Sequence, residues 1–483
     1  MRLKIRGGAV RYWQMFCLLM ILVLGMFLRL STATGTQVER PIRNDAKDYV
    51  SYAWNLKVFG IYSLDHSTLL HESRGTPQPD AVRPPAFPWL LHALIRDNVD
   101  MPFISRVAYV QAWISGVTLL CSTLLAMELI GGWAGLVVGA LVAISPHQII
   151  YVPYLLTETL YSSTLIFALG AAVLALKTNG TRARYLLAFV SGILFGLSCL
   201  VRPTIDHWVL ILLLSLLLPS MRHFRREIIV LALGFVLMMS PWWIRNEVSL
   251  HRMSDSSKML ETVQQGSYPD FMYEGRPETF GYPYSFDPAA DRAESSWSAV
   301  LADLRAKFAH QPVAMLRWYL FGKVASFFSW KEQEGWADMF EYPVLRSPWM
   351  TNNAFIIVTS FMWAAYTPLI AFGVAGTFVT FLPRTRALFG KSRADGIRFL
   401  ALLHLFVIGV HVAGAPFARY SVPFRPVTFF LAVFLLVWLF RSYLAYRLSL
   451  TSGTMGAEQL SFDRSPLPLM DNAGDHPHGL RYP

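Results

Sequence analysis

Cysteine and charge are both scarce in this sequence of 483 residues. The three cysteines, Cys17, Cys121 and Cys199, all lie within apolar runs, which excludes a disulfide framework and a cysteine-based zinc cluster. Charged residues make up only 15% of the chain and hydrophobic residues 54%, and the mean hydropathy is +0.40. This composition excludes an ordinary water-soluble domain and indicates an integral membrane protein.

The formal charge of +11 does not indicate a nucleic-acid partner, because the basic residues lie mostly in short segments between apolar runs. These basic segments are 2–11, 177–184, 222–226, 384–393 and 441–447. When the apolar runs are threaded through a membrane, every basic segment falls on the same side. Since short basic loops stay in the cytoplasm, the pattern predicts a cytoplasmic N-terminus.

The chain contains enough apolar runs for about ten transmembrane helices, at about 20 residues for each crossing. The predicted spans are 13–30, 103–127, 133–152, 155–176, 185–201, 207–219, 228–244, 352–382, 397–413 and 421–440. The sequence therefore predicts an all-α polytopic membrane protein in the inner (cytoplasmic) membrane. Its working surface is expected on the periplasmic or extracytoplasmic side, where the long polar segments fall.

This threading divides the chain into six segments. They are a first transmembrane helix in 1–30, a first outer loop in 31–102, transmembrane helices 2–7 in 103–244, a second outer loop in 245–351, transmembrane helices 8–10 in 352–448 and a disordered cytoplasmic tail in 449–483. Two short apolar stretches, 88–95 and 312–330, are expected to be interfacial helices in the two loops. Small residues after the first span leave open that it is a cleaved secretory signal.

Acidic residues stand directly after the first span, where Asp45 and Asp48 occupy the first outer loop ahead of Arg83. Carboxylates at a membrane face suggest chemistry rather than anchorage. Asp45 could instead favour the dipole of a helix that starts there. Arg83 precedes two prolines, which could simply stiffen the entry to the interfacial helix.

Further polar residues stand at the outer ends of predicted spans. They are Glu158, Arg202, Arg245, Arg419 and Tyr420. An ionisable residue at a helix entry normally faces protein or a water-filled cavity, because lipid exposure is costly. The planar donor fork of arginine suits phosphate oxygens, so several arginines at one membrane face could seat a lipid phosphate. The alternatives are snorkelling arginines and a structural hydrogen bond for Glu158.

The motifs around these residues, taken in order, resemble those of a known enzyme family. They are Asp45-Ala-Lys-Asp-Tyr49 with Ala53, Leu56 and Gly60-Ile-Tyr62, Arg83-Pro-Pro-Ala-Phe-Pro88, Pro153-Tyr-Leu-Leu-Thr-Glu158, Gly196-Leu-Ser-Cys-Leu-Val-Arg202-Pro203, Pro241-Trp-Trp-Ile-Arg-Asn246 and Arg419-Tyr-Ser-Val-Pro423. The chain, over about residues 10–440, resembles bacterial GT-C glycosyltransferases, relatives of protein O-mannosyltransferases and of the lipid A aminoarabinose transferase. The resemblance implies a GT-C-like helical bundle.

The resemblance also implies an activity: transfer of one sugar from a polyprenyl-phosphate donor to a hydroxyl acceptor on the outer membrane face. In such enzymes an acidic residue of the first outer loop is the catalytic base, and Asp45 occupies that position here. Asp48 stands where many relatives carry an uncharged residue, so either carboxylate of this pair could be the base.

The chemistry supports distinct roles for the candidate residues. An acceptor hydroxyl needs a base, whereas a phosphate leaving group needs positive charge and no acid. We expect Asp45 or Asp48 to be the base, Glu158 to orient the sugar or the acceptor, and some of the arginines to bind the phosphate. Tyr420 is grouped with Arg419 as substrate-binding, and attack from the opposite face would invert the anomeric carbon. No cofactor is expected, and metal dependence stays open.

Two other classes of function remain open at this level. A transporter or lipid-linked sugar flippase would also have many spans, but its ionisable residues should lie near mid-helix rather than at the outer ends. A structural protein of the cell envelope would not need the acidic residues at all. The sugar is undetermined, and the acceptor could be a lipid, a glycan or a protein, with membrane lipids as surroundings.

Overall fold

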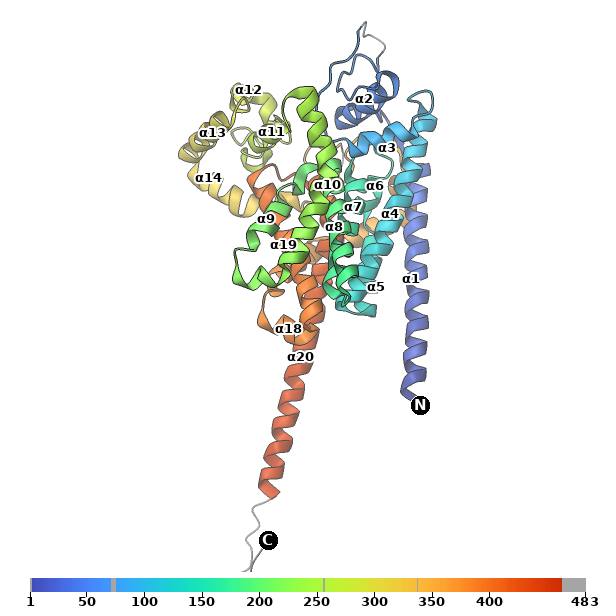
Figure 1. Cartoon of the computed structure of the whole chain (residues 1–483), viewed down its shortest axis with the longest axis vertical. Helices are drawn as coiled ribbons and strands as arrows, with labels where there is room; N and C mark the ends of the chain where they lie inside the picture. The colour runs from blue at the N-terminus through green and yellow to red at the C-terminus, as the bar shows by residue number, and fades with distance from the viewer. Residues whose placement is uncertain (1, 71–74, 255–256, 337, 463–483) are drawn as a thin grey trace, which may run out of the picture. The chain divides into compact units, whose positions relative to one another are not determined.

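The computed structural model describes residues 2–70, 75–254, 257–336 and 338–462. The chain divides into two compact units, residues 1–437 and 438–483, and the site described below lies wholly in the first. The described residues are almost entirely helical, with one two-stranded sheet (Figure 1). The prediction of an all-α polytopic membrane protein is confirmed.

Eight helices of the described residues are long and apolar enough to cross a membrane. They are, or lie within, α1 (Arg2–Gly35), α4 (Met101–Ile130), α7 (Glu158–Lys177), α8 (Thr181–Val201), α10 (Arg225–Leu250), α17 (Asn353–Val379), α19 (Lys391–Ala413) and α20 (Arg425–Phe462). The prediction of about ten spans is therefore too high by the criterion of length. Two predicted spans, 133–152 and 207–219, form shorter helices.

Proline shortens both of these helices. The first, α5 (Gly132–Ala143), ends just before Pro146, which begins the separate short helix α6 (Pro146–Ile150). The second, α9 (Trp208–Ser215), ends before Pro219 begins a 3₁₀ helix. Proline lacks an N–H donor and is favoured in the first turn of a helix, and Pro146 and Pro219 each begin a new helical element.

The shorter elements complete the chain. In the segment predicted as the first outer loop, 31–102, they are β1 (Gln37–Val38), α2 (Asn44–Phe59) and α3 (Ala86–Leu94). After α8 come η1 (Pro203–Ile205) and η2 (Pro219–Phe224). The second outer loop contains α11 (Ser257–Gln265), η3 (Pro269–Phe271), η4 (Pro277–Thr279), η5 (Pro283–Phe286), α12 (Ala290–Ala293), α13 (Trp297–His310), α14 (Pro312–Arg317), the π-helix η6 (Trp318–Gly322), α15 (Lys323–Phe327), β2 (Val344–Arg346) and α16 (Pro348–Thr351). The last are α18 (Pro383–Phe389) and η7 (Ala418–Phe424).

These bounds differ in places from the predicted segments. Helix α10 continues through Arg245 to Leu250, so it extends into the segment predicted as the second outer loop, 245–351. Helix α20 continues to Phe462, beyond the predicted start of the tail at 449. The rest of the predicted disordered tail, 463–483, lies outside the described residues. The segments predicted as interfacial helices contain α3 in one case and α14, η6 and α15 in the other.

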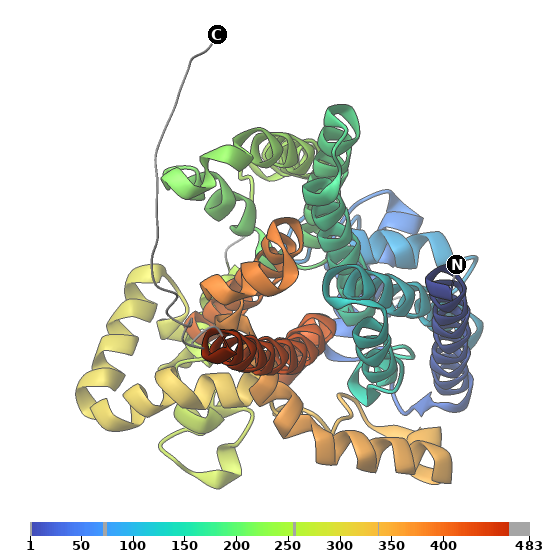
Figure 2. The same ribbon diagram turned by 90° about the horizontal axis from the view of Figure 1, so that it is seen from below.

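The buried charge of Arg29 attaches α1 to its neighbours. Its guanidinium donates to the carbonyls of Val142 and Ala143 at 3.2 and 3.3 Å, and its Nε donates to Ser115 at 2.8 Å. Those carbonyls stand at the C-terminal end of α5, where a cation is favoured by the helix dipole. Both ribbon views show α1 beside α4 and α5 (Figure 2). Arg29 therefore serves the packing of the bundle.

The two segments predicted as outer loops, called the first and second loops below, are joined to each other. Strand β1 pairs antiparallel with β2, and Glu39 N donates to the carbonyl of Pro343 at 2.9 Å. The hydroxyls of Thr36 and Ser347 lie 3.0 Å apart. These contacts bring the first loop, which carries Asp45, against the end of the second loop. Sequence segments far apart in the chain therefore meet at one end of this unit, where Figure 1 shows α2 and α3.

Candidate active site

Helix α2 presents its two aspartates on one face. Asn44 adopts the left-handed conformation, with φ of 45°, which asparagine tolerates better than most residues. Asp45 follows in the first turn, where a negative charge favours the helix dipole, and no side-chain hydrogen bond caps this end. Asp48 lies three residues on, so both carboxylates project from the same side of the helix.

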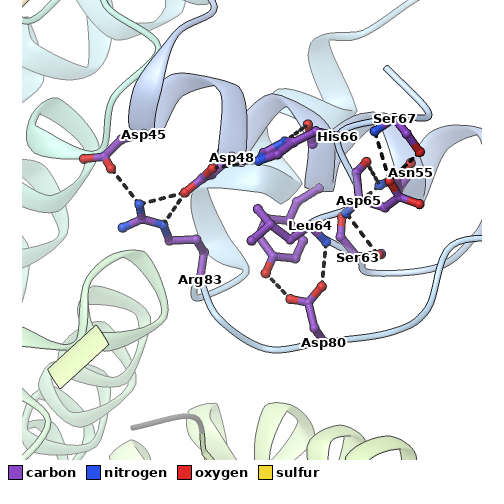
Figure 3. A network of polar contacts seen from close by, with 12 residues as sticks. Asp45, Asp48, Asn55, Ser63, Leu64, Asp65, His66, Ser67, Asp80 and Arg83 are labelled. Carbon is purple, nitrogen blue, oxygen red and sulfur yellow. Dashed lines mark hydrogen bonds and ion pairs between the residues drawn. The ribbon is translucent and has the colours of Figure 1, made fainter. Parts of the chain in front are cut away.

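Arg83 lies between the two aspartates and contacts both (Figure 3). Its Nη2 is 2.6 Å from Asp45 Oδ1 and 2.7 Å from Asp48 Oδ2, and its Nε is 3.0 Å from the same Asp48 oxygen. The hydroxyl of Tyr62 donates to the backbone carbonyls of Arg83 and Pro84, at 3.0 Å each. Tyr62 therefore fixes the backbone from which Arg83 reaches the aspartates.

Arg419 extends this ion pairing from the other side of Asp45. Its Nη2 is 3.0 Å from Asp45 Oδ2, and its Nη1 is 2.7 Å from Glu341 Oε1. The side chains of Asp45 and Arg419 are 23% and 12% exposed, so the pair is largely screened from water. The result is a continuous ion-pair chain, Asp48–Arg83–Asp45–Arg419–Glu341, built from both outer loops and the turn before α20.

A second ion pair, between Arg202 and Glu158, lies against this chain. Arg202 Nη1 is 3.1 Å from Glu158 Oε1, while the other carboxylate oxygen, Oε2, is buried and has no hydrogen-bond partner among the described residues. The ring of Tyr420 connects the two groups, since it lies 4.0 Å from the guanidinium carbon of Arg202 and 5.3 Å from that of Arg419. One aromatic ring thus contacts two of the arginines.

Burial and charge act in opposite directions on Asp45. Burial raises the pKa of its carboxyl, but the charges of Arg419, Arg83 and Arg202 outweigh burial and hold the pKa well below its usual value. For the two carboxylates of the second loop, burial outweighs the nearby positive charge. Burial raises the pKa of Glu341 despite the charge of Arg419, and it raises the pKa of Glu334 to about 7. Asp45 is therefore ionised at neutral pH.

The structure brings together most of the predicted site residues. Those that share the site are Asp45, Asp48, Arg83, Glu158, Arg202, Arg419 and Tyr420. Arg245 lies apart from them in its contacts, because its terminal nitrogens donate to the carbonyls of Asp80 and Tyr62 at 2.7 and 3.0 Å. The expectation that Arg245 joins the other arginines at the phosphate therefore has no contact to support it.

Two members of the network were not identified from the sequence. Glu341 closes the ion-pair chain from a segment that also carries Glu332 and Glu334, and this group of glutamates near the end of the second loop was an available signal. His66 lies with Nε2 3.3 Å from Asp48 Oδ1 and Nδ1 2.9 Å from the hydroxyl of Ser51. A lone loop histidine gives no sequence signal of this kind.

The arrangement combines carboxylates that can accept a proton with arginines that can hold an oxyanion. No group of three or more His, Cys, Asp or Glu residues in the described part of the chain is arranged to hold a metal ion. Each carboxylate in the ion-pair chain is bound by at least one arginine instead.

No protein-family model and no curated protein matches this sequence. Among solved structures, the chain is similar to AglB, the oligosaccharyltransferase of Archaeoglobus fulgidus in complex with an inhibitory peptide and a dolichol-phosphate; identity is 14%, the TM-score is 0.48, and 92% of this chain and 52% of that chain are covered. A second similar structure is an oligosaccharyltransferase of the same organism, tethered with an acceptor peptide containing the NVT sequon. Identity is 16%, the TM-score is 0.49, and 90% of this chain and 50% of that chain are covered. The chain thus spans about half the length of these two.

A third similar structure is ArnT from Cupriavidus metallidurans bound to undecaprenyl phosphate. Identity is 11%, the TM-score is 0.39, and 88% of this chain and 77% of that chain are covered. All three TM-scores lie below 0.5, so the functional assignment depends on the geometry of the site itself. The chain is structurally similar, at low sequence identity, to the GT-C enzymes AglB and ArnT, the group that its motifs resemble.

Proposed function

We propose that this protein is a membrane glycosyltransferase that moves one sugar from a polyprenyl-phosphate donor to a hydroxyl acceptor at the outer face of the cytoplasmic membrane. The observation that carries the proposal is the position of Asp45 between Arg83 and Arg419, with Arg202 close enough to lower its pKa as well. A carboxylate surrounded by arginines occupies a place that also suits the donor phosphate, because both are oxyanions that bind guanidinium groups.

This arrangement suggests how the base becomes active. When the donor phosphate binds, it competes with Asp45 for Arg83 and Arg419. Each guanidinium contact that Asp45 loses raises its pKa toward the ordinary value and makes it a stronger base. Asp45 would therefore be a weak base in the empty site and a competent base once the phosphate is in place.

In the chemical step, the acceptor oxygen attacks the anomeric carbon of the sugar while its proton moves to the Asp45 carboxylate. The bond between that carbon and the phosphate oxygen breaks, and the lipid phosphate leaves as an anion that needs no proton. Arg83 and Arg419 stabilise the charge that grows on the departing phosphate. Attack from the face opposite the phosphate inverts the anomeric carbon.

The test is sugar transfer by the purified protein in nanodiscs with a panel of polyprenyl-phosphate sugars and hydroxyl acceptors. Undecaprenyl and dolichyl carriers are the natural choices for the panel. Asp45→Asn keeps the shape of the side chain and should lower the transfer rate about 10²–10⁴-fold, while binding of the lipid phosphate persists. Asp97→Asn, an exposed aspartate of the same outer loop, is the matched control and should transfer at the wild-type rate.

Two outcomes would contradict this proposal, the first its choice of base and the second its class of activity. If Asp45→Asn transfers sugar at the wild-type rate, Asp45 is not the base. If the wild type binds the lipid-linked sugar and moves it across the bilayer without any transfer, the protein is a flippase.

A further inference from the structure

A cavity near the ion-pair chain is not used in the chemistry above. It is a cavity of about 460 Å³ between α2, the start of α3 and the end of α10. Its lining includes Leu56, Tyr62, Trp89, Pro241, Trp242 and Arg245. The volume is typical of small-ligand sites, and the lining combines aromatic and aliphatic surface with a single cation.

The cavity lies at the membrane boundary of α10. Ile244 and Val248, next to the lining residues on the same helix, are 62% and 73% exposed. Such exposed aliphatic side chains on a membrane-spanning helix are expected to face lipid. Trp89 and Trp242 are of the residue type that gathers at the membrane–water interface. A lipid could therefore enter the cavity from the bilayer.

Arg245 gives the cavity its positive charge. Its three hydrogen bonds go to the carbonyls of Tyr62 and Asp80 and to the side-chain oxygen of Asn246, at 3.0, 2.7 and 3.0 Å. Its guanidinium also lies over the rings of Tyr62 and Trp242, at 5.5 and 5.3 Å. Within the part of the chain that the structure describes, no carboxylate forms an ion pair with it. The charge of Asp80 acts on Arg245, but Asp80 binds it through its backbone carbonyl, so an anion in direct contact would have to come from a ligand.

We propose that this cavity binds an anionic lipid with a free hydroxyl group, and that this lipid is the acceptor of the sugar. This inference rests on the proposed function. A polyprenyl-phosphate sugar carries one phosphate, which the ion-pair chain would occupy, so Arg245 is available for the phosphate of a second lipid. Tyr62 joins the two sites, because its ring lines the cavity and its hydroxyl holds the backbone of Arg83.

The experiment uses the full chain in nanodiscs and phosphatidylglycerol with a photoactivatable acyl chain, since this lipid has both a phosphate and free hydroxyls. Crosslinks mapped by mass spectrometry should fall on residues 56–62, 79–89 and 241–249. Arg245→Gln should reduce this labelling about tenfold, the effect of losing one contact to a charged group. Arg317→Gln, at an exposed arginine paired with Asp270, should leave it unchanged.

Arg245→Gln also removes contacts to the loop backbone, so a second pair of variants keeps the test decisive. Ser249 lines the cavity and is exposed. Ser249→Glu places a negative charge there and should lower the labelling. Ser249→Gln introduces a neutral side chain of the same size as glutamate and should leave the labelling unchanged. Binding of undecaprenyl phosphate should be the same in all these variants, because it depends on the other site.

Several results would overturn the inference. Equal labelling by photoactivatable phosphatidylcholine would mean that the cavity does not select an anionic lipid with a free hydroxyl. Displacement of the probe by undecaprenyl phosphate would assign the cavity to the donor. Sugar transfer to another acceptor, unaffected by Ser249→Glu, would reject the acceptor role while leaving the proposed glycosyltransferase intact. Labelling as expected, with no transfer from any donor, would reject the glycosyltransferase and leave a lipid-binding cavity.

Discussion

Asp45 and Asp48 share one nitrogen of Arg83, whose Nη2 lies 2.6 Å from the first carboxylate and 2.7 Å from the second. Their remaining partners differ. Asp45 is bound on its other oxygen by Arg419, whereas the other oxygen of Asp48 faces His66. A phosphate that takes both arginines would release Asp45 from both of its partners, while Asp48 would keep His66. The two aspartates should therefore have separable roles.

Asp48→Asn is expected to impair donor binding more than the chemical step. The substitution removes the charge that holds Arg83 in place but leaves Asp45 available as base. The KM for the donor should rise about tenfold, with a smaller change in kcat, whereas Asp45→Asn should act mainly on kcat. Steady-state transfer kinetics over a range of donor concentrations would separate the two effects. A large fall in kcat for Asp48→Asn alone would move the base to Asp48, with His66 as its partner.

Lysine is not expected to replace the arginines of the ion-pair chain. Arg83 contacts both aspartates and Arg419 contacts both Asp45 and Glu341, so each needs a forked donor that lysine lacks. Arg83→Lys and Arg419→Lys should each weaken the binding of undecaprenyl phosphate about tenfold or more, measured by calorimetry or competition in nanodiscs. Arg317→Lys, at an exposed surface pair, is the control. Unchanged binding in both lysine variants would contradict a phosphate site here.

The ring of Tyr420, rather than its hydroxyl, should matter for the site. It contacts the guanidinium groups of Arg202 and Arg419, and such contacts contribute on the order of 1–2 kcal/mol when they are shielded from water. Tyr420→Phe should thus retain donor affinity, while Tyr420→Leu should raise the donor KM about tenfold. Loss of function in Tyr420→Phe would instead indicate a direct role for the hydroxyl.

The sequence predicts most of this site, and the exceptions have physical reasons. Asp45, Asp48 and Arg83 stand out because they lie in motifs of the polar segment that follows the first span, where carboxylates at a membrane face suggest chemistry. Arg245 also lies in such a motif, yet two of its three hydrogen bonds go to backbone carbonyls, which no side-chain pattern encodes.

The fold, like the site, could be predicted only in part. Hydropathy locates the long apolar helices, since each needs only a local run of residues, but Pro146 and Pro219 end two of the predicted spans early. The pairing of β1 with β2 depends on residues far apart in sequence and too few to form a recognisable strand pattern. Glu341 lies just before β2, so its place in the site depends on that pairing, although the nearby glutamates were a signal that the sequence offered.

Glu334 should make stability depend on pH. Burial raises the pKa of its carboxyl from 4.5 to about 7, against the opposing charge of Arg419, and its Oε1 accepts a hydrogen bond from the Tyr284 hydroxyl at 3.0 Å. Between these two values the folded protein keeps a proton that the unfolded chain has released. The free energy of unfolding should therefore fall as the pH rises through this window, by about 3 kcal/mol at most, and become level above it.

The Glu334→Gln variant provides the comparison, because glutamine is neutral at every pH. Its apparent Tm in detergent should fall less between pH 5 and pH 8 than that of the wild type. Glu278→Gln, at an exposed glutamate of the same loop, should keep the wild-type slope. A wild-type Tm that rises with pH across this window would show that Glu334 does not hold its proton in the folded state.

The ion pair between Asp45 and Arg419 has a consequence for biosynthesis. The two residues stand near opposite ends of the chain, so the ribosome completes Asp45 well before Arg419, at rates of about 5–20 residues per second. During this interval the Asp45 carboxylate lacks the arginine that binds its second oxygen. The ion-pair network closes only after the polypeptide beyond Arg419 has been made and inserted. A ribosome that stalls before that point would leave a chain with most of its spans and an incomplete site.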